Sequence, residues 1–461
     1  MLFSDLTFLF IFFPLFLICY FIFKDRKIRN IILLIFSLLF YAYGEPLYVF
    51  LMIFSILMNY YLAIKIDKNK KAVRKGIFVL TIVLNLALLI IFKYTSFLVG
   101  SINDLLNINV PIPEILLPIG ISFYTFQTIS YIVSVYKKEV AAQKNIIDLG
   151  CYITAFPQLI AGPIVRYETV QEELETRKEN IEDFSYGIRR FIIGLAKKVL
   201  IADYLGYVAS SIFKINDVGF IPAWVGMISY TLQIYYDFSG YSDMAIGLGR
   251  MMGFHFLENF NYPYIAKSVT DFWRRWHISL SSFFKDYVYI PLGGNRVKKM
   301  KFARNIFIVW ALTGLWHGAS WNFVIWGLFY GTILIIEKMF LKKYLDKLPT
   351  VFCHMYTLLI VIIAWVIFNN ENISTIVDIL KSMFMLNGIG DIEYLNYIQV
   401  LDIKYILALI MGIIFAMPIY NKIEKKIKNK YIMDIIIILI FVLSIISILN
   451  STYSPFIYFR F

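Results

Sequence analysis

The feature that most constrains this chain is a series of apolar runs, each near 20 residues long, that recurs from one end to the other. A helix needs about 20 apolar residues to cross the hydrocarbon core of a bilayer. The 461-residue sequence is 60% hydrophobic and 16% charged, which lies outside the usual range of soluble domains. The sequence therefore predicts an all-α polytopic membrane protein.

The apolar runs predict about 11 transmembrane helices. They lie at roughly 7–23, 30–44, 47–64, 76–96, 117–136, 220–237, 240–254, 320–336, 351–368, 404–419 and 431–449. The run 146–168 is interrupted by Pro157, Gly162 and Pro163, which predicts a re-entrant element buried among other helices. Basic residues within the apolar pattern of 189–198 predict an interfacial helix. We expect a single membrane domain over residues 1–461.

The charges of the loops predict the orientation of the chain. Cations cluster after the first, third and fifth spans and again around Lys425, whereas the intervening loops hold few. Cytosolic loops of membrane proteins are enriched in Lys and Arg. We therefore expect the loops around Lys70 and Lys425 in the cytosol and both termini outside the cell membrane. The same enrichment explains the net charge of +13 without a nucleic-acid partner.

Two further sequence patterns argue against a metal site, a local disulfide and a signal peptide. Cys19, Cys151 and Cys353 are too scattered for a metal site or a local disulfide, so we expect no bound metal. The first apolar run is followed, rather than preceded, by basic residues and shows no small-residue cleavage site. This pattern predicts a retained helix and not a signal peptide.

The stretch 268–330 concentrates the side chains that could carry chemistry, with six of the eight Trp and two of the four His. Its first half, TDFWRRWHISLSSFFKD, predicts one amphipathic helix at a membrane interface, because aromatic and aliphatic residues recur at helical spacing. That face carries Phe272, Trp276, Leu280 and Phe283. The opposite face would turn Arg274, His277, Ser281 and Lys285 toward water or a channel.

The second half of the stretch is a membrane-depth segment with one titratable group, because His317 is the only ionisable residue from Asn305 to Gly327. Such a group is costly in hydrocarbon and indicates a functional site. The alternative is a neutral structural histidine, hydrogen-bonded to a backbone carbonyl or to Thr313. Gly314 and Gly318 favour the functional interpretation, since they leave space for another backbone or a ligand.

Several strings in this sequence resemble the membrane-bound O-acyltransferase (MBOAT) family. They are most similar to its bacterial branch that acetylates polysaccharides, and more distantly to the branch that transfers D-alanine to teichoic acids. The resemblance covers nearly the whole chain in the expected order. The strings are DFWRRWHISLSSFFKDYVYIPLGGNR, GLWHGASWNFVIWG, LPIGISFYTFQTISYIVSVYKK, FPQLIAGPIVRY, QIYYDFSGYSDMAIGLGRMMGF and the C-terminal FIYFRF.

This resemblance implies a fold, an activity and partners. The fold would be a ring of tilted spans around a thinned centre near His317, and the enzyme would pass acyl groups, above all acetyl, from a cytosolic donor to an extracytoplasmic glycan. Acetyl-CoA is the expected donor, with no permanently bound cofactor, and a secreted or membrane-anchored esterase-like acetyltransferase is the expected partner. His317 and His277 match the family's histidines. Tyr458, in the motif 456–461, matches a tyrosine thought to carry the acyl group.

Other candidate residues have two interpretations each. Asp237 and Asp243 lie between apolar spans, where they could orient an imidazole or pair with Arg250 or Arg274. Arg166, Arg274 and Arg275 could bind cofactor phosphates, or they could extend to the membrane interface. Trp316 and Asn322 are expected to support His317.

Two other functions remain open from the sequence. A lipid- or protein-directed O-acyltransferase would share the fold, and a transporter without acyl chemistry would fit a buried histidine among polar neighbours equally well. Membrane lipids surround the chain in every case.

Overall fold

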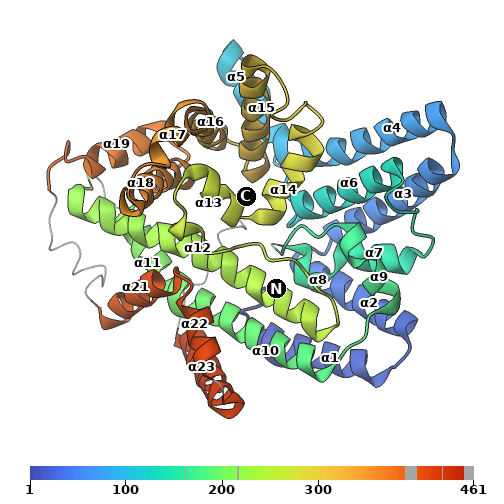
Figure 1. Ribbon diagram of the computed structural model, residues 1–461. Coiled ribbons are helices and arrows are strands. Elements are labelled where there is room, and N and C mark those ends of the chain that lie inside the picture. The colour runs from blue at the N-terminus through green and yellow to red at the C-terminus, as the bar shows by residue number, and fades with distance from the viewer. Residues whose placement is uncertain (161, 215–217, 390–401, 428, 451–461) are drawn as a thin grey trace. The chain divides into compact units, whose positions relative to one another are not determined.

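The computed structural model describes residues 1–160, 162–214, 218–389, 402–427 and 429–450 (Figure 1). These residues form helices, turns and loops, with no strand among them. The prediction of an all-helical chain is therefore confirmed. The chain divides into two compact units, which are Met1–Phe191 with Ser242–Leu257 and Ile192–Tyr241 with Glu258–Phe461. We call them the first and the second unit.

Helices that could cross a membrane occur in both units. Six helical segments of the described chain are long and apolar enough, namely Arg26–Gly44, Tyr48–Lys68, Lys71–Leu106, Trp321–Leu345, Thr350–Asn369 and Lys430–Asn450. Phe8–Ile22 and Ile403–Phe415 are shorter apolar helices. A multi-pass membrane protein is thus confirmed, whereas the number of about 11 spans stays a prediction.

The first unit is built around an aromatic cluster. Phe156 packs its ring against Phe12, Phe16 and Phe40 at centroid distances of 5.6, 5.1 and 5.7 Å. Its helices are η1 (Phe8–Phe12), α1 (Phe13–Ile22), α2 (Arg26–Gly44), α3 (Tyr48–Lys68), α4 (Lys71–Leu89), η2 (Ile90–Tyr94), α5 (Thr95–Leu106), α6 (Ile121–Lys137), α7 (Ile146–Thr154), α8 (Phe156–Leu159) and α9 (Tyr167–Thr176). The run 146–160 forms short, mostly buried helices, and its re-entrant path stays a prediction.

The second unit contains the stretch 268–330. Its helices are η3 (Lys197–Ala202), α11 (Asp203–Ile212), η4 (Pro263–Ile265), α13 (Val269–Arg275), α14 (Ile278–Phe284), η5 (Lys285–Tyr289), α15 (Lys299–His317), α16 (Trp321–Ile336), η6 (Glu337–Leu341), α17 (Lys342–Leu345), α18 (Thr350–Asn369), α19 (Ile373–Met383), α21 (Ile403–Phe415), α22 (Ile419–Lys426) and α23 (Lys430–Asn450). Helices α10 (Ile181–Ala196) and α12 (Phe220–Met251) run from one unit into the other.

The prediction of two spans at 220–237 and 240–254 is wrong, because α12 is one continuous helix of 32 residues. A helix of that length measures about 48 Å. Gly240 does not break it. A side chain at this position would meet the backbone oxygen of Gly194, so the glycine serves close packing between α12 and α10 within the second unit.

The single amphipathic helix expected over TDFWRRWHISLSSFFKD is also wrong. Helix α13 ends at Arg275, His277 has a left-handed backbone with φ of 44°, and α14 begins at Ile278. The backbone groups at this break bond to a remote segment. The Arg275 carbonyl accepts from the Asn261 N–H and the Ile278 N–H donates to the Asn259 carbonyl, both at 2.9 Å. These bonds replace the helical ones that a continuous helix would need.

Candidate functional site

The break between α15 and α16 positions His317. The two helices form a close pair (Figure 1), because Gly314 and Gly327 have no side chain where the helices meet. A side chain on Gly314 would overlap the Phe323 carbonyl, and one on Gly327 would overlap the Trp310 carbonyl. Gly318 is extended, with φ of −168°, and ends α15 directly after His317. The membrane-depth segment 305–327 is therefore a helix end, a break and a helix start. Gly314 leaves space for another backbone, as expected.

Aromatic rings enclose His317, which is only 2% exposed. The rings of Trp316, Trp326 and Phe368 lie edge to face with the imidazole at centroid distances of 5.0, 5.0 and 5.2 Å. Thr313 was the expected hydrogen-bond partner of His317 if that histidine were structural. Its hydroxyl donates to the Val309 carbonyl at 2.8 Å. The apolar walls exclude bulk water from the imidazole.

Asn322 places one of these walls. Its Nδ2 donates to the carbonyl oxygens of Ile367 and Phe368, both at 3.3 Å, at the C-terminal end of α18. The last carbonyl groups of a helix have no partner within the helix, so a side-chain amide stabilises this end. Asn322 thereby holds Phe368 against His317, and the supporting role expected for it in the reaction stays a prediction.

His277 is the second histidine of the site and is fully buried, not turned toward water as the amphipathic helix implied. Its Nδ1 lies 3.2 Å from Asn259 Oδ1, and its ring meets Phe238 edge to face at 4.7 Å. Burial lowers the pKa of the His277 imidazole from 6.5 to about 3. The imidazole is therefore neutral at pH 7.

The Trp316 ring lies between the two histidines and contacts both. Its ring centroid lies 5.7 Å from His277 and 5.0 Å from His317, with both imidazoles edge to face. The indole separates a histidine at the end of α15 from one at the break between α13 and α14. The structure thus brings His277, Trp316, His317 and Asn322 into one buried cluster of the second unit.

The two aspartates form salt bridges with basic side chains. Asp237 accepts a salt bridge from Lys198 at 2.8 Å, and the same ammonium group lies 2.7 Å from Asp203. Asp243, in the first unit, pairs with Arg190 at 2.6 Å. Both aspartates therefore form salt bridges with basic side chains, and the supporting role expected for them stays a prediction. Lys198, expected at an interface, is buried between Asp203 and Asp237.

The three arginines belong to different units and have different surroundings. Arg166 belongs to the first unit, where it lies 3.8 Å from Glu168. Arg275 pairs with Asp271 at 3.1 Å and donates to the Asn261 carbonyl, so it holds the end of α13. Arg274 is exposed. Of the three, Arg274 has the exposure that a phosphate-binding guanidinium needs.

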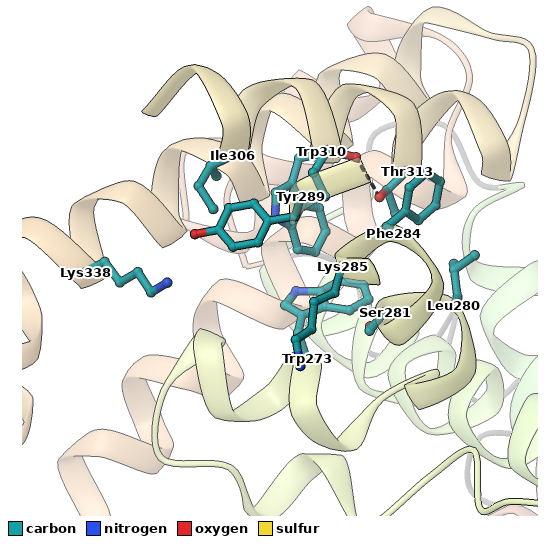
Figure 2. Close-up of a pocket in the computed structure, with 11 residues that line it drawn as sticks. Trp273, Leu280, Ser281, Phe284, Lys285, Tyr289, Ile306, Trp310, Thr313 and Lys338 are labelled. Atoms are coloured by element: carbon teal, nitrogen blue, oxygen red, sulfur yellow. Dashed lines mark hydrogen bonds between the residues drawn. The ribbon is translucent and has the colours of Figure 1, made fainter. Parts of the chain in front are cut away.

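A cavity of about 170 Å³ lies between α13, α14, η5, α15 and η6. Figure 2 shows Trp273 and Lys285 on one side, Trp310 of α15 on the other, and Lys338 extending toward them. No acidic residue is among the described residues that line it. Thr313 is part of its wall, one helical turn before His317. The cavity therefore combines aromatic walls with positive charge close to the histidine cluster.

Sequence reasoning missed several residues that shape the site. Phe368 lies 51 residues after His317 and Asn259 lies 18 residues before His277, and neither lies in a pattern that predicts contact. Glu337 is buried and accepts hydrogen bonds from the backbone N–H groups of Val269 and Thr270 at 2.6 and 2.9 Å. A carboxylate within an apolar run was the one available signal for Glu337.

A buried histidine cluster on a multi-pass helical scaffold fits a membrane enzyme, and comparison with known proteins shows which family of enzymes it belongs to. The model of the membrane-bound O-acyltransferase family matches residues 137–376. The chain belongs to the MBOAT family, as its motifs implied. It is an O-acyltransferase enzyme.

Two relatives of this chain are bacterial O-acetylating proteins. The probable alginate O-acetylase AlgI of Pseudomonas putida is 39% identical over 100% of this chain and 100% of its own length. The peptidoglycan O-acetyltransferase of Helicobacter pylori is 36% identical over 85% of this chain and 81% of its own length.

A third relative transfers a different acyl group. The teichoic acid D-alanyltransferase of Bacillus subtilis is 32% identical over 49% of this chain and 60% of its own length. The two branches named from the motifs are thus both among the relatives.

Proposed function

We propose that this O-acyltransferase passes acetyl groups from a cytosolic donor to an extracytoplasmic glycan, either a polysaccharide or a cell-wall polymer. Full-length similarity to a probable alginate O-acetylase and similarity to a peptidoglycan O-acetyltransferase support this substrate class. The observation that carries the chemistry is the enclosure of His317 by Trp316, Trp326 and Phe368. A transfer site must keep water away from a thioester, and these rings do so.

The proposed reaction is acyl transfer from a thioester to a hydroxyl. The imidazole of His317 accepts the hydroxyl proton while the hydroxyl oxygen attacks the carbonyl carbon of the thioester. The new C–O bond replaces the C–S bond, and the departing thiolate takes up a proton. The aromatic walls contribute by excluding water, which would otherwise compete as the nucleophile.

We propose acetyl-CoA as the donor, which would approach through the cavity between α13 and α15. Lys285 and Lys338 line this cavity, and Arg274 is exposed at the end of α13, so all three are suited to phosphate groups. The aromatic wall formed by Trp273 and Trp310 suits the slender pantetheine chain. A carrier protein that bears phosphopantetheine would present the same chemistry.

We also propose the orientation and the partner that the motifs imply. The loops around Lys70 and Lys425 face the cytosol, both termini lie outside the cell membrane, and a secreted or membrane-anchored esterase-like acetyltransferase completes the transfer. Tyr458 lies outside the described residues and stays a proposed acyl carrier. A phenol is a better leaving group than a sugar hydroxyl, so its ester remains activated.

The fate of a labelled acetyl group tests the substrate class. Cells that express this chain are given labelled acetate, and the label is measured in the extracytoplasmic glycan, in lipid and in membrane protein. We expect the label in the glycan as a base-labile ester, and a Tyr458→Phe variant should lose it at equal membrane abundance.

Other distributions of the label would reject the proposal. Ester label confined to lipid or protein would show a different acceptor. Transport of a substrate without any acyl transfer would indicate a transporter.

A further inference from the structure

A buried asparagine lies beneath His277 at the break between α13 and α14. Asn259 is fully buried, and its carbonyl accepts from the Ile278 N–H at 2.9 Å. The neighbouring Asn261 N–H donates to the Arg275 carbonyl at the same distance. This backbone pairing fixes the segment 259–261 against both sides of His277. The side chain of Asn259 is therefore held in one register under the imidazole.

The contacts of Asn259 determine which atom of its amide faces His277. The backbone N–H of Ser279 lies 3.1 Å from Oδ1, and the Ser279 hydroxyl donates to the same oxygen at 2.9 Å. A backbone N–H can only donate, so the atom it meets must be the amide oxygen. A reversed amide would place two donors against each other.

This assignment determines the tautomer of His277. Its Nδ1 lies 3.2 Å from Asn259 Oδ1, an atom that can only accept. The Ser279 hydroxyl also lies 3.5 Å from Nδ1, but it donates its hydrogen to Asn259 Oδ1 at 2.9 Å. Nδ1 therefore carries a hydrogen, and in a neutral imidazole Nε2 then bears the free lone pair. Nε2 is buried and has no hydrogen-bond partner in the described part of the chain.

We propose that Asn259 is a positioning residue, which holds His277 in the Nδ1-protonated tautomer so that Nε2 offers its lone pair to an O–H or N–H group of the bound substrate. This inference rests on the proposed function and adds a role for His277. An unsatisfied buried acceptor destabilises the folded protein, and a purely structural histidine would avoid that cost.

The backbone of His277 supports the same conclusion. Its φ of 44° lies in the left-handed region, which a residue with a side chain rarely occupies. Such a conformation persists where surrounding contacts impose it, and it concentrates at functional sites. Here the paired segment 259–261 imposes it and directs the ring between Phe238 and Trp316.

The tautomer can be observed directly because the chain has only four histidines. The purified protein is labelled with ¹⁵N-histidine in lipid bilayers, and a His277→Gln variant identifies the His277 resonances. We expect a protonated Nδ1 and an unprotonated Nε2 in the native protein. An unprotonated Nδ1 would overturn the proposal without reference to activity.

Substitutions at Asn259 connect the tautomer to acetylation. Asn259→Leu removes the acceptor at similar size, and we expect mixed tautomers and a 10- to 100-fold loss of glycan acetylation, the usual effect of removing a group that orients a histidine. Asn259→Asp keeps an acceptor, so Nδ1 should stay protonated. Native tautomer and native acetylation in Asn259→Leu would overturn the proposal.

A matched control separates this role from packing alone. Ser279→Ala removes a hydroxyl that lies 2.9 Å from Asn259 Oδ1 and 3.5 Å from His277 Nδ1, and it leaves the bond between Nδ1 and Oδ1, so the native tautomer should persist. If Asn259→Leu fails to insert, the spectra of the native protein and of Asn259→Asp still decide the question. If the native chain acetylated no glycan, the proposed function would fail while the tautomer remained measurable.

Discussion

His277 and His317 are two buried imidazoles with different surroundings. Aromatic rings surround His317 at centroid distances near 5 Å, and Nδ1 of His277 lies 3.2 Å from Asn259 Oδ1. Burial disfavours a charged imidazole, and only a neutral one can accept a proton. The site therefore has one imidazole in apolar walls and one whose tautomer is fixed by a hydrogen bond.

Burial of His277 has a consequence for stability that depends on pH. Its pKa is about 3 in the folded protein and 6.5 ordinarily, so the unfolded chain binds more protons between these values. Stability is complete above pH 6.5 and falls as the pH decreases toward 3. At pH 5 the loss is about 2 kcal/mol. We expect the purified protein to unfold at a lower temperature at pH 5 than at pH 7.5.

The His277→Gln variant is the comparison for this effect, because it removes the titrating group and keeps a polar side chain. Its unfolding temperature should depend less on pH over the same interval. An equal pH dependence in both proteins would show that His277 does not cause it.

At the residue scale, the sequence predicted that His317 is a functional residue in an apolar segment, but it did not predict which aromatic side chains surround the imidazole. A single ionisable residue between Asn305 and Gly327 is visible in any sequence of this composition. Phe368 lies 51 residues after His317, and the cap that Asn322 provides to α18 and the rings of Phe323 and Trp326 hold it beside His317. Asn259 lies in a loop, where the sequence has no helical periodicity that could predict its contact with His277.

At the element scale, short helices carry the site and remote side chains hold them. Helix α13 has seven residues, too few to be stable alone. Ser268 caps it locally by accepting from the Asp271 N–H at 3.0 Å. Glu337 of η6 accepts from Val269 and Thr270 in addition, so a carboxylate 67 or more residues away stabilises its N-terminus.

Removal of this carboxylate should loosen α13. We expect Glu337→Ala to destabilise the second unit by about 2–3 kcal/mol, since two buried N–H groups lose a charged acceptor. Trypsin should then cleave faster after Arg274 and Arg275, at the end of α13. Glu337→Gln keeps one acceptor oxygen and should have a smaller effect. Unchanged cleavage in Glu337→Ala would exclude the capping role.

Apolar periodicity predicted the long helices well and their interruptions poorly. The expected spans at 30–44, 351–368 and 431–449 correspond to α2, α18 and α23. The helix expected across His277 fails because the backbone there bonds to 259–261, and the break expected near Gly240 fails because α10 packs on that glycine. Both outcomes depend on tertiary contacts, which local patterns do not contain.

At the scale of the whole molecule, composition was sufficient to predict a multi-pass membrane protein, and motifs were sufficient to predict its family. The site residues are divided between the units, with both histidines in the second and Arg166 in the first. Orientation rests on the alternation of cations alone and stays a prediction. The proposed acyl donor is based on the chemistry of the residues that line the cavity, and the proposed partner enzyme is based on the sequence motifs.

The central claim is that acyl transfer depends on the imidazole of His317. The acetyl content of the extracytoplasmic glycan is measured for the native chain, for His317→Ala and for His255→Ala at matched membrane abundance. His255 is the control, because it is exposed and pairs with Glu173 in the first unit. We expect the acetyl content to fall by at least about 100-fold in His317→Ala, because this is the usual contribution of a general base. We expect native acetylation in His255→Ala. Native acetylation in His317→Ala would contradict the central claim.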